Sequence, residues 1–232
     1  MTQAMDRDEV LEWLRKRGTR RTVEGMARYG ITAKRAFGVP MGTLLALSKK
    51  LGKDHVLATA LWESGWYEAR LLAALVGDPK CVTRRQMNAW AASFENWGDC
   101  DTVCFKLFDQ TLFAWEKARQ WAASPREFVR RGGFVMIACL ALHDKDASDK
   151  PFLAFLPLIE KGARDERNFV SKGVNWALRA IGRRNRTLNA AATGVARRLA
   201  LSEGAACRWV GQDALRELAS PKVRAKLVRR AR

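Results

Sequence analysis

Apolar residues recur at three- and four-residue spacings along almost the whole chain, and no polar–apolar alternation is long enough to predict a strand. Glycines that follow helix ends and prolines that follow a polar capping residue separate the helical segments, as at Gly52, Gly77, Pro125 and Pro221. Asp8 is the expected N-cap of the first segment. Roughly a dozen short helices must therefore build the fold, either as a globular bundle or as a stack of helix pairs.

Spacing between the helix pairs favours the stack. From Tyr67 onward the pairs recur about every 35 to 45 residues, the range of HEAT-like repeats, although the repeats share no visible sequence identity. The length of 232 residues suits one compact domain or one short repeat array. We therefore expect an all-α protein, a curved solenoid of HEAT-like helix pairs whose concave groove is basic. We expect residues 1–232 to form this single domain.

Charge points to a polyanionic partner. Lysine and arginine total 42 against 24 acidic residues, which gives a net charge of +18 and a pI near 10.4. A surplus of this size on a folded domain favours a nucleic-acid-binding protein over a basic cytosolic protein that has no such partner. No stretch approaches the roughly 18 apolar residues of a membrane helix, and the N-terminus lacks a signal-peptide core. We expect a monomeric, cytoplasmic protein that associates with the nucleoid when it binds DNA, and no membrane partner.

The cysteines give little support to a metal site. Cys100 and Cys104 lie four residues apart and could share a helix face, but the only histidines are His55 and His143. No second cysteine or histidine pair has ligand spacing. We expect neither a metal nor another cofactor.

The helix predicted over residues 166–184 has two contrasting faces. At 100° per residue, one face forms an apolar stripe, which consists of Val170, Val174, Ala177, Leu178 and Ile181. The opposite face carries Lys172, Trp176, Arg179 and Arg183. A large indole among cations suits contact with phosphates and sugar rings. The alternative is a solvated charged face with a half-buried tryptophan.

A second basic cluster opens the next helix upstream, PREFVRRGGFVMIACLAL. Arg126, Arg130 and Arg131 lie in its first turns, where the helix dipole favours acids over bases, so a phosphate could dock there. The mid-helix pair Gly132 and Gly133 indicates either close helix packing or close approach of a ligand.

The segment NWGDCDTVC holds the candidate catalytic carboxylate. Trp97 and Asp101 are four residues apart and share a helix face, whereas Asp99 lies nearer the helix start and is expected to act as a partner of the helix dipole. Asp101 could pair with a neighbouring arginine or stand as the one carboxylate on a basic, aromatic surface.

Three further segments are expected to lie outside the chemistry of the site. We interpret Trp62, Trp66, Glu68 and Arg70 as packing with an internal charge pair. The C-terminal segment over residues 222–232 is expected to be a frayed, solvated helix, and the segment RRNR over residues 183–186 a peripheral electrostatic contact.

These clusters, in this order, resemble the AlkD family of bacterial DNA alkylation-repair glycosylases. The resemblance runs from LWESGWYEARLLAALVGDP through NWGDCDTVC and FVRRGGFV to FVSKGVNWALRAIGRRN, about two thirds of the chain. It implies a curved stack of HEAT-like helix pairs that holds duplex DNA in its groove and excises N3- and N7-alkylated purines without base flipping. It implies that Asp101 is catalytic, that Trp97 and Trp176 contact the lesion, and that Arg131 contacts the backbone. Gly98, where several relatives have Asp, and the Gly132–Gly133 pair depart from the family pattern.

The chemistry agrees with this resemblance. An alkylated purine is already cationic, so its departure needs no general acid, and a carboxylate such as Asp101 can stabilise the positive charge that develops on the sugar. The partner is then double-stranded DNA that contains alkylated bases, with phosphates held by Arg130, Arg131, Lys172, Arg179 and Arg183. Two alternatives stay open, a non-catalytic HEAT-type module that binds nucleic acid or protein, and a helical protein that binds or modifies RNA.

Overall fold

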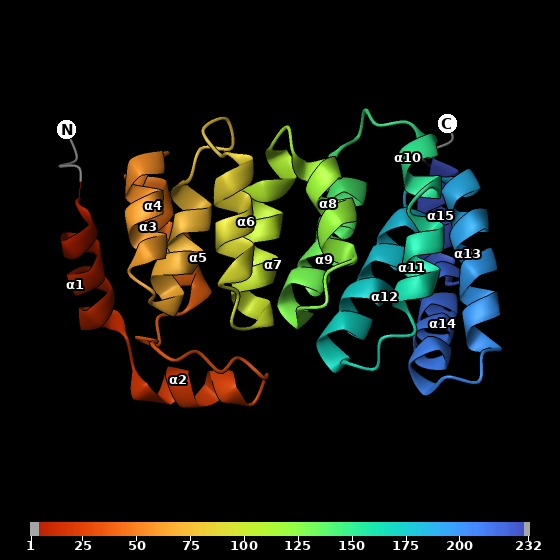
Figure 1. The fold of residues 1–232 in the computed structure, drawn as a ribbon, viewed down its shortest axis with the longest axis horizontal. Coiled ribbons are helices and arrows are strands. Elements are labelled where there is room, and N and C mark those ends of the chain that lie inside the picture. The colour runs from red at the N-terminus through yellow and green to blue at the C-terminus, as the bar shows by residue number, and fades with distance from the viewer. Residues whose placement is uncertain (1–4, 230–232) are drawn as a thin grey trace. The chain divides into compact units, whose positions relative to one another are not determined.

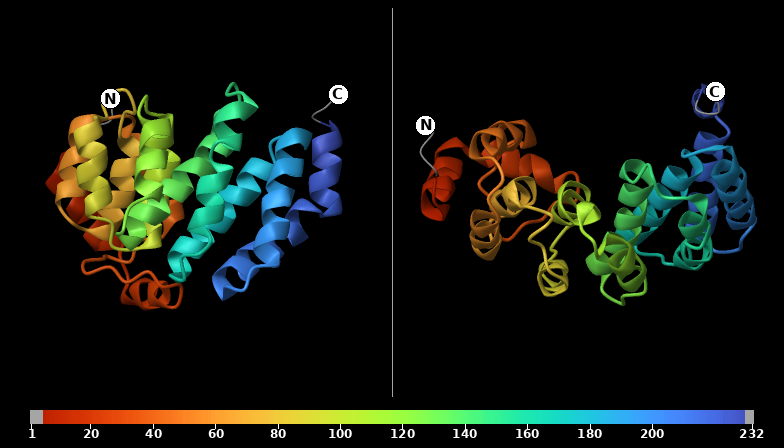
Figure 2. Two further views of the ribbon diagram at one scale, coloured as in Figure 1. Left: turned by 45° about the vertical axis from the view of Figure 1, so that its right-hand side comes forward. Right: turned by 90° about the horizontal axis from the view of Figure 1, so that it is seen from above.

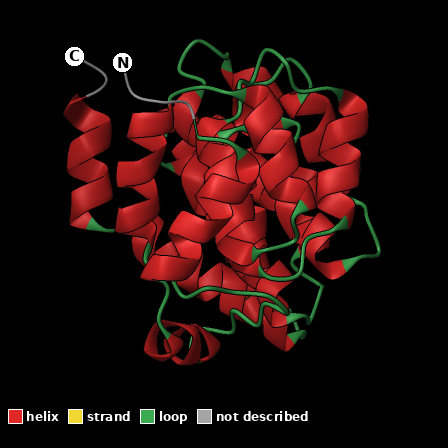
Figure 3. Ribbon diagram, turned by 90° about the vertical axis from the view of Figure 1, so that its left-hand side faces the viewer, coloured by secondary structure: helices red, strands yellow, loops and turns green. Residues whose placement is uncertain are grey.

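The computed structural model describes residues 5–229, and every regular element in that range is a helix (Figures 1 and 3). The prediction of an all-α protein is therefore confirmed. None of the described helices is both long enough and apolar enough to cross a membrane. The elements are α1 (Arg7–Arg17), α2 (Arg20–Ala27), α3 (Met41–Leu51), α4 (His55–Glu63), α5 (Tyr67–Val76), α6 (Arg84–Ala92), α7 (Trp97–Lys106), the 3-10 helix η1 (Phe108–Gln110), α8 (Ala114–Ala122), α9 (Glu127–His143), α10 (Asp149–Leu153), α11 (Leu156–Gly162), α12 (Asn168–Gly182), α13 (Arg186–Ala200), α14 (Ala205–Leu218) and α15 (Pro221–Arg229).

Helix packing divides the chain into two compact units, unit 1 over Met1–Phe113 and unit 2 over Ala114–Arg232. In unit 1, α5 packs against α3, α4 and α7; in unit 2, α9 packs against α8 and α12, and α13 packs against α14 (Figures 1 and 2). Successive helices such as α8 and α9 thus lie side by side, and helices from neighbouring pairs, such as α9 and α12, pack on one another, as in stacked helix pairs. The assignment of residues 1–232 to one domain and the concave groove stay predictions.

The N-terminal helices differ from the sequence expectation. The N-cap of α1 is Asp6 rather than Asp8, because Asp6 forms a capping box with Glu9 and accepts from the Asp8 and Glu9 amides. Helix α2, which the sequence pattern did not predict, buries none of its residues and lies across the ends of the other unit 1 helices (Figures 1 and 2).

The two faces of α12 follow the prediction. All five residues of the apolar stripe are fully buried, whereas Lys172 is exposed and Trp176, Arg179 and Arg183 are partly exposed. The C-terminal helix is more firmly packed than expected, because Val223 and Leu227 of α15 are buried. Residues 230–232 of that predicted segment lie outside the described part of the chain.

The glycine pair in α9 reflects close helix packing. A Cβ atom built on Gly133 would overlap the backbone of Ala122 at the end of α8. The first of the two sequence alternatives therefore accounts for Gly133, because α8 and α9 can approach this closely only where one of them lacks a side chain.

We expect Gly133→Ala to destabilise the protein by about 1–3 kcal/mol, the usual cost of overpacking. Gly194→Ala is the matched control, because a Cβ on Gly194 of α13 would meet only the end of the Arg198 side chain, at 3.9 Å. The control should gain up to about 1 kcal/mol through helix propensity. Urea unfolding measures both values, and equal stabilities for the two variants would contradict the packing argument.

Candidate nucleic-acid interface

The start of α7 is held by a buried carboxylate. Asn96 caps the helix, and Asp99, which is 1% exposed, completes a capping box with it. The Asp99 oxygens accept from the backbone amides of Glu95 at 3.1 Å, Asn96 at 3.2 Å and Cys100 at 2.7 Å. The expected role of Asp99 at the N-terminus of this helix is confirmed.

Arg70 lies against this carboxylate. Its Nη1 lies 3.6 Å from Asp99 Oδ2 and donates to the Ser93 carbonyl at 3.1 Å. The Arg70 guanidinium also covers the Trp62 ring. Burial raises the pKa of Asp99 to about 6, while the three amides and Arg70 oppose a larger rise. Asp99 is thus a structural acid of the helix start.

The predicted charge pair between Glu68 and Arg70 is wrong in its partners. The fully buried Glu68 carboxylate instead accepts from the amides of Phe37 at 2.9 Å, Gly38 at 2.6 Å and Val39 at 3.2 Å. These amides belong to a segment that precedes α3, and sequence spacing cannot show that such a distant segment supplies the donors.

Trp97 is the first residue of α7 and is partly exposed. Its indole Nε1 donates to the Tyr29 carbonyl at 2.8 Å, which ties the indole to the loop after α2. That loop is held in turn by Glu68 and by Phe37, which stacks on Trp66 at a centroid distance of 3.9 Å. The Trp97 ring is therefore positioned by a contact with the loop after α2 as well as by its place at the start of α7.

Asp101 lies one helical turn after Trp97 and is partly exposed. Burial raises the pKa of the Tyr67 hydroxyl, and the negative charges of Asp99, Glu68 and Asp101 raise it further. A Cβ atom on Gly98 would overlap that same hydroxyl, so the contact with Tyr67 requires glycine at this position. Of the two acids on α7, Asp99 is buried in the cap and Asp101 reaches the surface.

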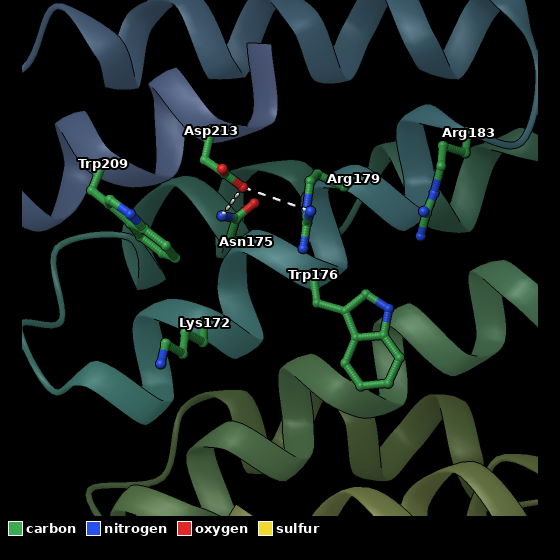
Figure 4. Close-up of a pocket in the computed structure, with 7 residues that line it drawn as sticks. All are labelled: Lys172, Asn175, Trp176, Arg179, Arg183, Trp209 and Asp213. Atoms are coloured by element: carbon green, nitrogen blue, oxygen red, sulfur yellow. Dashed lines mark hydrogen bonds and ion pairs between the residues drawn. The ribbon is translucent and has the colours of Figure 1, made fainter. Parts of the chain in front are cut away.

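Unit 2 gathers the predicted cations and Trp176 around one pocket of about 450 Å³ (Figure 4). Helix α12 lines it with Lys172, Asn175, Trp176, Arg179 and Arg183, and α14 lines it with Trp209 and Asp213. The sequence pattern thus brought four predicted residues of α12 to one place. It missed the contribution of α14 to the pocket, although Trp209, Asp213 and Glu217 recur every four residues and indicate a second polar face.

Acids of α14 pair with the arginines of α12. Arg179 Nη1 lies 2.6 Å from Glu217 Oε2 and 3.6 Å from Asp213 Oδ2, and Arg183 Nη1 lies 2.9 Å from Glu217 Oε1. Asp213 also accepts from Asn175 Nδ2 at 2.8 Å (Figure 4). The pocket is therefore a network of opposite charges and not a purely cationic surface.

The cluster at the start of α9 is more structural than its sequence suggested. Arg131 is only 6% exposed, and its Nη1 donates to the Phe169 carbonyl of α12 at 2.6 Å. Arg130 Nε lies 3.3 Å from Asp165 Oδ2. Both arginines connect α9 to the start of α12, and their predicted phosphate contacts stay a prediction that this geometry does not favour.

No group of three His, Cys, Asp or Glu side chains within residues 5–229 is arranged to hold a metal ion.

We expect the Asp99 carboxyl to titrate with a midpoint near pH 6 in the folded protein, because burial disfavours its charged form. The folded-state pKa lies above the ordinary aspartate pKa of 3.8, so the stabilisation is complete below pH 3.8 and is lost as the pH rises through about 6. The stability of the wild type relative to Asp99→Asn should fall across this window. Carbon-13 NMR of the carboxyl measures the midpoint, and a value below 3.8 would contradict the assignment.

Comparison with known proteins agrees with this architecture. One solved structure superimposes with a TM-score of 0.75 at 20% sequence identity, over 83% of this chain and 83% of that chain. It is described as a new family of proteins related to the HEAT-like repeat DNA glycosylases with affinity for branched DNA structures, and this likeness confirms the HEAT-like fold. Among curated proteins, none matches the chain at a significant level. The family model described as DNA alkylation repair enzyme matches residues 10–218, and the chain therefore belongs to the family of DNA alkylation repair enzymes.

Proposed function

We propose that the chain is a monofunctional DNA glycosylase that removes cationic N3- and N7-alkylated purines from duplex DNA. Membership of the alkylation repair family supports a DNA substrate, and the basic composition supports a polyanionic one. In this proposal the reaction is hydrolysis of the N-glycosidic bond, without base flipping and without a metal or another cofactor.

The observation that carries the proposal is the contrast between the two acids of α7. Asp99 is buried and held by three backbone amides, so it serves the fold, whereas Asp101 is partly exposed one turn beyond Trp97. A carboxylate at a DNA-binding surface is repelled by the phosphates and weakens binding. A carboxylate is therefore expected at such a surface where its charge has a function.

The proposed mechanism needs little more than this charge. The alkylated base leaves as a neutral purine, positive charge develops on the deoxyribose, and Asp101 stabilises that charge and orients the attacking water. The water adds to C1′ and loses its proton to solvent. The electron-rich faces of the indoles favour a cationic transition state, and we propose a lesion contact for Trp97 and for Trp176.

The cations of unit 2 would hold the DNA backbone. We propose that Lys172, Arg179 and Arg183 contact phosphates, because they line one pocket on the polar face of α12. Arg130 and Arg131 would act by fixing α12 from α9.

A second candidate is a non-catalytic DNA-binding protein. The structural relative is described by its affinity for branched DNA rather than by glycosylase activity, and the charge of this chain suits such a ligand equally. Release of free base from methylated duplex DNA distinguishes the two functions, because a binding protein retains the DNA intact.

We expect Asp101→Asn to slow the release of 7-methylguanine by about 100- to 1000-fold, the usual effect of losing one electrostatic stabiliser. The substitution preserves shape and removes only the charge. Glu63→Gln, which removes an exposed charge at the end of α4, is the control and should retain the parental rate. Single-turnover chromatography of the released base measures both rates. A parental rate in Asp101→Asn would remove Asp101 from the mechanism.

A further inference from the structure

One carboxylate in unit 2 holds two arginines of the pocket at once. Each Glu217 oxygen pairs with a different guanidinium group: Oε2 lies 2.6 Å from Arg179 Nη1, and Oε1 lies 2.9 Å from Arg183 Nη1. Arg179 and Arg183 are four residues apart on α12, so their side chains extend from the same helix face. This pair of guanidinium groups is a ready receptor for a bidentate oxyanion.

We propose that Glu217 occupies the place of a DNA phosphate and competes with the backbone of DNA for Arg179 and Arg183. A phosphodiester presents two non-bridging oxygens that share one negative charge, as a carboxylate does, and guanidinium groups donate charge-assisted hydrogen bonds to the oxygens of either group. Glu217 is thus an internal stand-in for the ligand, and DNA binding requires it to release both arginines.

The exchange is accessible because the ion pairs are at the surface. The side chains of Arg179, Arg183 and Glu217 are 29%, 31% and 27% exposed, and solvent weakens pairs of this kind. Glu217 can therefore turn into water, and the phosphate that takes its place supplies the negative charge that the partly buried guanidinium groups require. Within the pocket, Trp209 and Lys172 lie on the same surface and are available to the incoming sugar–phosphate chain (Figure 4).

A second arrangement of Arg179 has a partner in place. Within residues 5–229, neither the buried Nε of Arg179 nor the buried Oδ1 of Asn175 has a hydrogen-bond partner. Asn175 is 1% exposed and is oriented by Asp213, which accepts from its Nδ2 at 2.8 Å. The orphan donor and the orphan acceptor lie four residues apart on α12, so a rotation of Arg179 away from Glu217 can bring them together.

This inference deepens the proposed function, since it takes duplex DNA as the ligand of the α12 face and adds a device that limits the affinity. Glu217 weakens binding to any DNA backbone, so retention of the protein depends more on contacts made elsewhere, at a lesion. A protein of net charge +18 would otherwise bind every duplex tightly.

The test measures binding of the full chain to an undamaged duplex oligonucleotide by fluorescence anisotropy. Glu217→Gln keeps the shape of the side chain and removes its charge, and we expect about 3- to 5-fold tighter binding, the scale of a surface ion pair. The matched control is Glu160→Gln in the same unit, which removes the same charge from a pair with Arg198 of α13. We expect the control to change the affinity less than about 2-fold.

A double-mutant cycle separates exchange from general repulsion. In the background of Arg179→Gln and Arg183→Gln, the gain from Glu217→Gln should vanish, because the competing phosphate site is gone. Circular dichroism checks the fold of each variant, and Arg183→Gln alone replaces the double variant if that one does not fold, with the gain expected to shrink.

Each outcome decides the proposal. A gain in DNA affinity that is specific to Glu217→Gln, and that is absent when Arg179 and Arg183 are replaced, supports the proposal. A gain equal to that of Glu160→Gln, a gain that persists without the arginines, or weaker binding overturns it. If the wild type releases no base but Glu217→Gln binds DNA more tightly as expected, only the proposed glycosylase activity is overturned. If the wild type releases base but Glu217→Gln does not bind DNA more tightly, only this inference is overturned.

Discussion

The buried carboxylate of Asp99 is the interaction on which the candidate site depends. Three amides at the start of α7 point at one side chain, and Arg70 supplies the opposite charge at 3.6 Å. A helix start built in this way cannot shift without exposing unsatisfied donors, so the direction of α7 is set at its first turn. Trp97 then lies at the beginning of the helix and Asp101 one turn later, at the surface of unit 1. The structural acid and the functional candidate are two residues apart, and only Asp99 is buried in the cap of α7.

Unit 2 solves a different problem with the same elements. The apolar face of α12 is completely buried, which leaves the opposite face to carry Lys172, Trp176, Arg179 and Arg183. Acids on α14 restrain two of these cations through Glu217 and Asp213. In both units, then, a helix with one apolar side is anchored by packing, and its polar side is organised by carboxylates. What differs is the burial of the carboxylate, which makes Asp99 permanent and Glu217 exchangeable.

Features that depend on local periodicity were predictable from the sequence, and features that depend on distant partners were not. The apolar stripe of α12 and the place of Asp99 in the first turn of α7 follow from spacing along one helix, whereas the sequence left two explanations open for Gly133 because its partner Ala122 belongs to another helix. Helix α2 was not predicted because it is only eight residues long, and Val23, Met26 and Ala27 are too few apolar residues to establish a repeat. Arg131 was predicted to contact a phosphate, but its Nη1 donates to the carbonyl of Phe169, which lies 38 residues away, and no pattern in the sequence indicates this partner. The Glu217 bridge was missed for the same reason.

The central claim is that the charge of Asp101 faces a sugar that becomes cationic as the base departs. The most direct measurement compares the affinity of the protein for two duplexes, one with a positively charged pyrrolidine abasic analogue and one with its neutral tetrahydrofuran counterpart. The account predicts that the wild type prefers the cationic analogue by about 10-fold or more and that Asp101→Asn loses this preference. Equal affinity of the wild type for both duplexes, or an undiminished preference in Asp101→Asn, would contradict it.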